Sequence, residues 1–166
     1  MSVPAVVGTT QKVTLPVFDG GDLPDLLKKI YKTGCVVSGE ALSILKQLVY
    51  APGRAESDVV VLKAVDFRVD KRRILDIRHS AQNQGMQDVK PIQAAFLPLA
   101  CSRSFVQEMG IVTLVAVHTA VLTSSGRHCF LGLSFSGKAP ELFAYDANPA
   151  NEWDPKVGFV FRAPRS

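Results

Sequence analysis

Two histidines in the C-terminal third of the chain could bind a metal or accept a proton, because neutral imidazole does both. They are His118 and His128. If residues 124–126 form a three-residue hairpin loop, His118 lies opposite Gly132 and about 13 Å from His128, at roughly 3.3 Å per strand residue. Ligands of one zinc ion each lie about 2.0–2.1 Å from it, so these rings cannot share a metal. We expect His118 to be a packed, hydrogen-bonded core residue, and we predict no metal site.

Cys129 directly follows His128, and such a pair could supply a nucleophile and its base. Adjacent strand residues point to opposite faces of a sheet, so this imidazole cannot activate this thiol. Cys129 shares its predicted face with Leu131, which favours a core position. Cys35 and Cys101 are distant in sequence, and no C-x-x-C pair occurs. We expect three free, mostly buried thiols in a reducing compartment rather than a disulfide framework.

A basic segment over residues 68–79 is the best candidate for a functional surface. Its cations can contact phosphates, with an affinity that falls as salt rises. It lacks interleaved aromatic residues, so stacking on bases is not predicted. Asp76 would neutralise part of its charge, and an ordinary solvated helix face is the competing interpretation. The candidate nucleic-acid contacts are Arg68, Lys71, Arg72, Arg73 and Arg78.

An acidic loop over residues 146–155 carries three carboxylates near Trp153, the single tryptophan. A calcium loop needs ligands at alternate positions and a glycine at its turn. This loop has two prolines and no glycine, which favours a rigid turn without metal. Trp153 then either folds back onto the sheet or anchors a partner. The other predicted partner contacts lie in the N-terminal segment and are Val13, Leu15 and Phe18.

The chain contains none of the short signatures of nucleotide-binding loops, serine hydrolases, zinc proteases or zinc deaminases. We predict no cofactor and a non-enzymatic role. An active site built from dispersed residues would leave no such signature, so that alternative stays open, as does a small-ligand or protein-inhibiting module.

The composition is that of a single globular domain. Its 166 residues are 47% apolar, which suits a packed core and not a disordered chain. The net charge of +4 is compatible with a polyanionic partner without requiring one. The longest apolar stretch, 111–122, is shorter than the roughly 20 residues that a membrane helix needs, and the N-terminus lacks the pattern of a signal peptide. We expect a cytoplasmic protein without a membrane partner.

Helices dominate the prediction for the first part of the chain. Asp22 and Ser38 are suited to cap two helices that form a hairpin, and a run of β-branched residues follows as a central strand. Residues 92–99 predict a strand interrupted by Pro98. The predicted helices cover 22–33, 38–50, 70–82 (with Asp70 as cap) and 102–110, the central strand lies near 58–66, and residues 1–21 form an extended arm or edge strand before a single domain over 22–166.

Strands follow one another in the last third of the chain with no helix between them, which predicts an antiparallel sheet. Its strands are expected near 111–123, 127–136, 141–146 and 157–162. This sheet packs against the helical hairpin, so the fold class is α+β.

The predicted sheet is apolar on both faces. The helical hairpin can cover one of them, and the other needs a second sheet, further helix or another subunit. We therefore expect a non-enzymatic structural or assembly protein that forms homo-oligomers, such as a viral or phage structural component, which would place it in the virion. The alternative is a nucleic-acid-binding accessory or regulatory protein that uses the basic segment.

Overall fold

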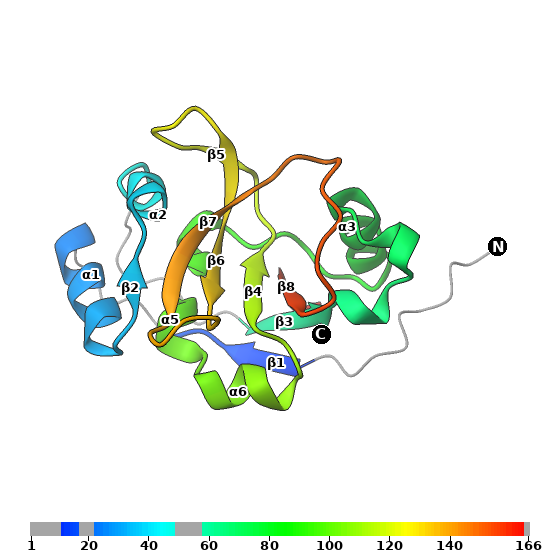
Figure 1. Cartoon of the computed structure of the whole chain (residues 1–166), viewed down its shortest axis with the longest axis horizontal. Helices are drawn as coiled ribbons and strands as arrows, with labels where there is room; N and C mark the ends of the chain where they lie inside the picture. The colour runs from blue at the N-terminus through cyan, green and yellow to red at the C-terminus, as the bar shows by residue number, and fades with distance from the viewer. Residues whose placement is uncertain (1–10, 17–21, 49–57, 165–166) are drawn as a thin grey trace.

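A computed structural model describes residues 11–16, 22–48 and 58–164, and it contains a mixed β-sheet with helices packed on it (Figure 1). The α+β class is confirmed. Among the described residues the sheet has eight strands in the order β1-β3-β8-β4-β6-β7-β2, with β5 paired to β6 off this path. The strands are β1 (Gln11–Thr14), β2 (Val36–Val37), β3 (Asp58–Lys63), β4 (Thr113–Ala116), β5 (Val121–Leu122), β6 (His128–Ser134), β7 (Glu141–Asp146) and β8 (Val157–Arg162).

The sequence predicts that the C-terminal strands are all antiparallel, and the structure shows that they are not. Strand β4 runs parallel to β8, and β2 runs parallel to β7, whereas the other pairs are antiparallel. After β7 the chain does not turn back as a hairpin. Residues 147–156 carry it to the middle of the sheet, where β8 lies between β3 and β4. A parallel neighbour requires such a crossover, and no local pattern in the sequence announces one.

The helices begin where their caps predict. The side chains of Asp22, Ser38 and Ser102 each accept a hydrogen bond from the backbone N–H three residues later, at 3.1–3.2 Å. The predicted hairpin 22–33 and 38–50 is present as α1 and α2, but α2 ends at Leu45, earlier than predicted, and residues 49–50 lie outside the described ranges. The helices are α1 (Leu23–Lys32), α2 (Gly39–Leu45), α3 (Ile74–Asn83), α4 (Pro91–Ala94), α5 (Leu97–Ala100) and α6 (Arg103–Glu108).

Two expectations for the middle of the chain are wrong. The helix predicted over 70–82 begins at Ile74, and Asp70 is not its cap but part of the 3-10 turn η2 (Val69–Lys71), which follows η1 (Ala64–Asp66). Residues 92–99 are helical in α4 and α5 instead of extended. Each of these short helices has a proline in its first turn, where a missing N–H costs nothing.

Two hydrophobic cores lie on opposite faces of the sheet. The first face carries Leu131 and Leu142 and is covered by α1, α2 and the short helices α4, α5 and α6. The second face carries Phe130 and Phe159 and is covered by α3 and η1, with Trp153 at its margin. In Figure 1, α1 and α2 lie beside β2 and β7, and α3 lies at the other end of the molecule. The second face therefore does not need another subunit to cover it, which corrects the premise on which self-association was predicted.

Candidate functional site

His118 is a hydrogen-bonded core residue, as predicted. Its side chain is fully buried, and its Nε2 accepts a hydrogen bond from the Leu131 N–H at 2.9 Å. Nδ1 lies 2.7 Å from the Thr119 carbonyl oxygen, which can only accept, so the proton of the ring is on Nδ1. Burial lowers the pKa of His118. Both ring nitrogens are occupied by the backbone, and the neutral ring has a structural role.

The position of His118 differs from the prediction in one respect. The predicted hairpin register holds next to the loop, where Leu122 pairs with His128. It does not extend to β4, because Gly132 pairs with Val115 and not with His118. Residues 117–120, between β4 and β5, do not pair with β6. The Leu131 N–H of β6 donates instead to the ring of His118. The space above Gly132 is filled by a tyrosine ring, since a Cβ there would lie 2.5 Å from Tyr145 Cε2.

The three cysteines are free and buried. Burial raises the pKa of Cys35 to about 11 and that of Cys101 to about 12, and it also raises the pKa of Cys129. A thiolate is the reactive form of cysteine, so all three are protonated and poorly nucleophilic near neutral pH. Within the described residues, no group of three or more acidic, histidine or cysteine side chains is placed to hold a metal ion.

The basic segment is paired with carboxylates on most of its length. Four of its five cations lie within 4.0 Å of one: Arg68 with Asp70, Lys71 with Asp76, Arg73 with Glu152 and Arg78 with Asp88. The remaining cation, Arg72, donates from Nε to the carbonyl oxygens of Ala64 and Phe67 at 3.0 and 3.2 Å.

These contacts divide the segment into two parts. Arg72 and Arg78 are partly buried and hold the backbone, since Arg78 also donates to the His118 carbonyl oxygen at 3.3 Å. Arg68, Lys71 and Arg73 are exposed. Lys71 lies in η2, so it does not stack above Arg78 on one helix face as a single helix from Asp70 would place it. The structure therefore does not bring the five side chains together as one free cationic surface, and nucleic-acid binding by this segment stays a prediction.

Trp153 folds back onto the second face of the sheet. Its ring meets Phe159 edge-on at 5.5 Å between centroids and lies 6.4 Å from Tyr145. The loop that carries Trp153 is held to the segment before α3 by two contacts. The backbone N–H of Trp153 donates to the Arg72 carbonyl oxygen at 2.9 Å, and Arg73 pairs with Glu152. Of the two roles predicted for this residue, the structure shows the intramolecular one.

The β5–β6 hairpin projects beyond the body of the sheet and is held by α2 (Figure 1). Glu40 accepts hydrogen bonds from Ser125 at 2.6 Å and from Arg127 at 2.5 Å, and Arg127 also lies 3.9 Å from Asp146. Gln47 donates to the Leu122 carbonyl oxygen at 2.7 Å. The hairpin tip is thus fixed to a helix on the first face.

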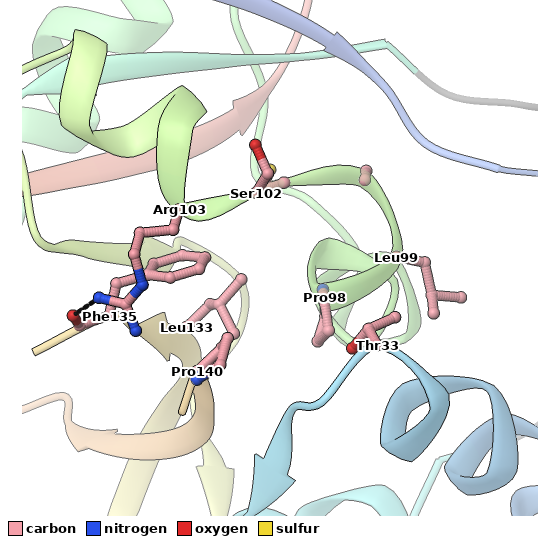
Figure 2. Close-up of a pocket in the computed structure, with 10 residues that line it drawn as sticks. Thr33, Pro98, Leu99, Ser102, Arg103, Leu133, Phe135 and Pro140 are labelled. Carbon is pink, nitrogen blue, oxygen red and sulfur yellow. Dashed lines mark hydrogen bonds between the residues drawn. The ribbon is translucent and has the colours of Figure 1, made fainter. Parts of the chain in front are cut away.

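A pocket of about 360 Å³ lies between α5 and the far end of β6 (Figure 2). Pro98 and Leu99 form one wall, and Leu133 and Phe135 form the other, with Arg103 beside Phe135. The guanidinium of Arg103 donates to the carbonyl oxygens of residues 135, 137 and 138 at 2.7–3.1 Å, so it fastens this turn to α6. None of the ten lining residues is a carboxylate or a histidine. The pocket can hold a small apolar group but offers no general base.

Three N-terminal residues were predicted to bind a partner. Val13 and Leu15 are buried in the first-face core of their own chain, and Phe18 lies outside the described residues. Residues 11–14 of the predicted arm form β1, which pairs with β3 at one end of the sheet. Val13 thus packs in its own domain, whereas the other three side chains of β1 are exposed, and the backbone of β1 is also available to a partner strand.

The hydrogen bonds around β3 show which of its residues face β1. The Ala163 N–H donates to the Asp58 carbonyl oxygen at 3.0 Å, so Asp58 directs its backbone groups toward β8. Successive residues of a strand direct these groups to opposite neighbours. Val59 and Val61 therefore direct theirs toward β1.

The same alternation determines which residues of β1 are unpaired. Val59 and Val61 pair with Val13 and Gln11. Lys12 and Thr14 must then direct their N–H and C=O groups away from β3. No described residue pairs with this side of β1, which is an open sheet edge. A strand edge of this kind can accept another strand.

Comparison with known proteins found no match to a family model, to a curated protein or to a solved structure. Within the described ranges, none of the helices has the length and apolar character that crossing a membrane takes.

Proposed function

We propose that this chain is a structural protein that assembles with copies of itself through the open edge of β1. The observation that carries the proposal is the outward direction of the backbone groups of Lys12 and Thr14. Addition of a strand at such an edge satisfies these groups with new main-chain hydrogen bonds.

The arrangement of the cores supports an edge contact over a face contact. Both faces of the sheet are covered by helices of the same chain, so a second copy has little apolar sheet to cover. Pairing at β1 would instead extend the sheet sideways and leave both cores as they are. Each added hydrogen bond contributes about 0.5–1.5 kcal/mol, so an interface of few bonds forms only at high protein concentration.

Thr14→Pro tests the proposal, because proline removes an N–H that points outward and leaves the ladder to β3 intact. The full chain and the variant are compared by sedimentation over a concentration series. We expect the wild type to associate as its concentration rises and Thr14→Pro to remain monomeric. Thr14→Ser, which keeps the N–H, is the matched control and should associate.

Far-UV circular dichroism and the melting temperature establish that the variants are folded. If Thr14→Pro is unfolded, Lys12→Pro removes the other outward N–H and takes its place. A wild type that is monomeric at every concentration overturns the proposal, and so does a folded proline variant that still associates.

A further inference from the structure

We propose that two copies pair antiparallel through β1 about a two-fold axis at Val13, so that Lys12 of each copy lies opposite Thr14 of the other. This inference rests on the proposed self-assembly and adds its register. It starts from the two residues that direct their backbone groups outward, Lys12 and Thr14.

The alternation of side chains limits the registers that are possible. Val13 belongs to the first face, whereas Lys12 and Thr14 lie on the second. A continuous sheet keeps side chains of one face together across the new pair, so the axis must pass through a residue rather than between two. The outward residues Lys12 and Thr14 meet each other or their own copies only when the axis lies at Lys12, Val13 or Thr14.

Two of these three axes are unfavourable. An axis at Lys12 places two ammonium groups directly opposite each other, and like charges in that arrangement are destabilising. An axis at Thr14 places Lys12 opposite Pro16, which has no N–H to donate. An axis at Val13 pairs both outward residues with each other twice, which gives four hydrogen bonds and no facing like charges.

Charge complementarity also favours the axis at Val13. In each copy the Lys12 Nζ lies 2.9 Å from Asp58 Oδ2, and the Thr14 hydroxyl donates to Asp58 Oδ1 at 2.7 Å. In the proposed pair, Lys12 of one copy lies opposite Thr14 of the other and hence beside its Asp58. Two ammonium groups and two carboxylates then alternate along the second face of the junction.

Cysteine cross-linking distinguishes the three axes, since only a residue on a two-fold axis meets its own copy. Residues at a non-hydrogen-bonded antiparallel pair have Cα atoms about 4.5 Å apart, close enough for a disulfide. We expect Val13→Cys in the full chain to give a reducible covalent dimer under mild oxidation. Lys12→Cys and Thr14→Cys report the other two axes and should remain at background. The native cysteines are buried and protonated, so they should not compete.

The outcomes separate the register from the proposed function. Cross-linking at Lys12→Cys or Thr14→Cys instead of Val13→Cys overturns the axis while self-assembly stands. Association of the wild type without a cross-link at any of the three positions places the interface elsewhere and overturns this inference, and a strictly monomeric wild type overturns both.

Val13 is buried, so its variant could unfold, and Asp58→Asn provides a second measurement. In the proposed register Lys12 of the other copy faces Thr14 and lies beside Asp58, so loss of the Asp58 charge should weaken association up to about fivefold, the size of an exposed ion pair. Unchanged association of a folded Asp58→Asn variant would contradict the register.

Discussion

The two faces of the sheet are covered in different ways. The first face meets five helices, and its buried side chains are mostly Leu, Ile, Val and Ala, with Phe96 and Phe135 as the aromatic exceptions. The second face meets one regular α-helix, and its smaller core contains four buried phenylalanines with Tyr145 and Trp153 packed against it. Aromatic side chains bury a large area each, so few of them cover a face that would otherwise need more helices. A single sheet can thus be sealed by many small contacts or by a few large ones.

The largest expected effect is at the centre of the second face. Phe159 is fully buried against Trp153, so Phe159→Ala should destabilise the fold by about 3–5 kcal/mol, the usual cost of a large cavity. Phe143→Ala, on the same face but 37% exposed, is the control and should cost about 1 kcal/mol or less. Urea unfolding measures both. Similar losses in the two variants would mean that α3 does not seal this face.

Glycines on opposite faces give the next comparison. A Cβ at Gly132 would lie 2.6 Å from the Leu114 carbonyl oxygen, whereas a Cβ at Gly158 would meet only side-chain atoms, at 2.7 Å from Ile111 and Val61. Both alanine variants should be destabilised by about 1–3 kcal/mol, and Gly132→Ala more so, because a backbone carbonyl in a ladder cannot move aside. Gly137→Ala, whose nearest neighbour is 3.7 Å away, should change little in the same thermal unfolding assay. A milder effect at Gly132 than at Gly158 would contradict this order.

His118 makes the stability of the fold depend on pH. Its pKa is lowered in the folded state, so the unfolded chain binds more protons as the pH falls below about 6.5. The contribution of His118 to the free energy of unfolding is fully present above the unfolded pKa. It is lost as the pH falls toward the lower pKa of the folded state, with a slope of at most about 1.4 kcal/mol per pH unit. His118→Leu should remove this slope and cost about 1–3 kcal/mol at neutral pH, because the Leu131 N–H loses its acceptor. A slope that persists in the variant would assign it to other groups.

The smallest effect is expected where Glu40 of α2 binds Ser125 and Arg127 of the β5–β6 hairpin. Hydrogen bonds from Ser125 and Arg127 lower the pKa of Glu40, so its contribution is present above the ordinary carboxyl pKa and is lost as the pH falls through the lowered one. Glu40→Gln should reduce the melting temperature slightly at pH 7, and added salt should shrink the difference. A melting curve of each protein at low and high salt measures this. No difference at low salt would show that the hydrogen bonds of Gln47 and Ser43 are enough to hold the hairpin.

Local signals in the sequence predicted local structure well. The caps at Asp22, Ser38 and Ser102 determine where three helices begin, and Gly126, with a φ of +83°, ends the hairpin loop that was expected at 124–126. The burial of His118 also followed from its apolar neighbours. Each of these features depends on residues within a few positions of one another, and patterns of helix capping and apolar spacing describe sequence at that range.

Long-range features were missed because no short pattern encodes them. Residues 117–120 have the apolar character of a strand, yet they leave the ladder so that the register shifts between β5 and β4. The charges that neutralise Arg73 and Arg78 come from Glu152 and Asp88, and Glu152 is distant in sequence. The direction of the β1 backbone groups, on which the proposed interface depends, required the pairing of three strands. The inward residues Ile74, Ile77 and Ala81 of α3 were the available signal that the second face could be covered from within.

The central place of β8 has a consequence for how the chain reaches its fold. Strands β3 and β4 are synthesised well before residues 157–162, which separate them in the sheet. Until the ribosome has passed Arg162, each of these earlier strands lacks a neighbour and presents an edge that can capture the wrong one. The sheet should therefore be completed only once β8 has been synthesised, and nascent chains that stop before β8 would depend on chaperones to remain soluble.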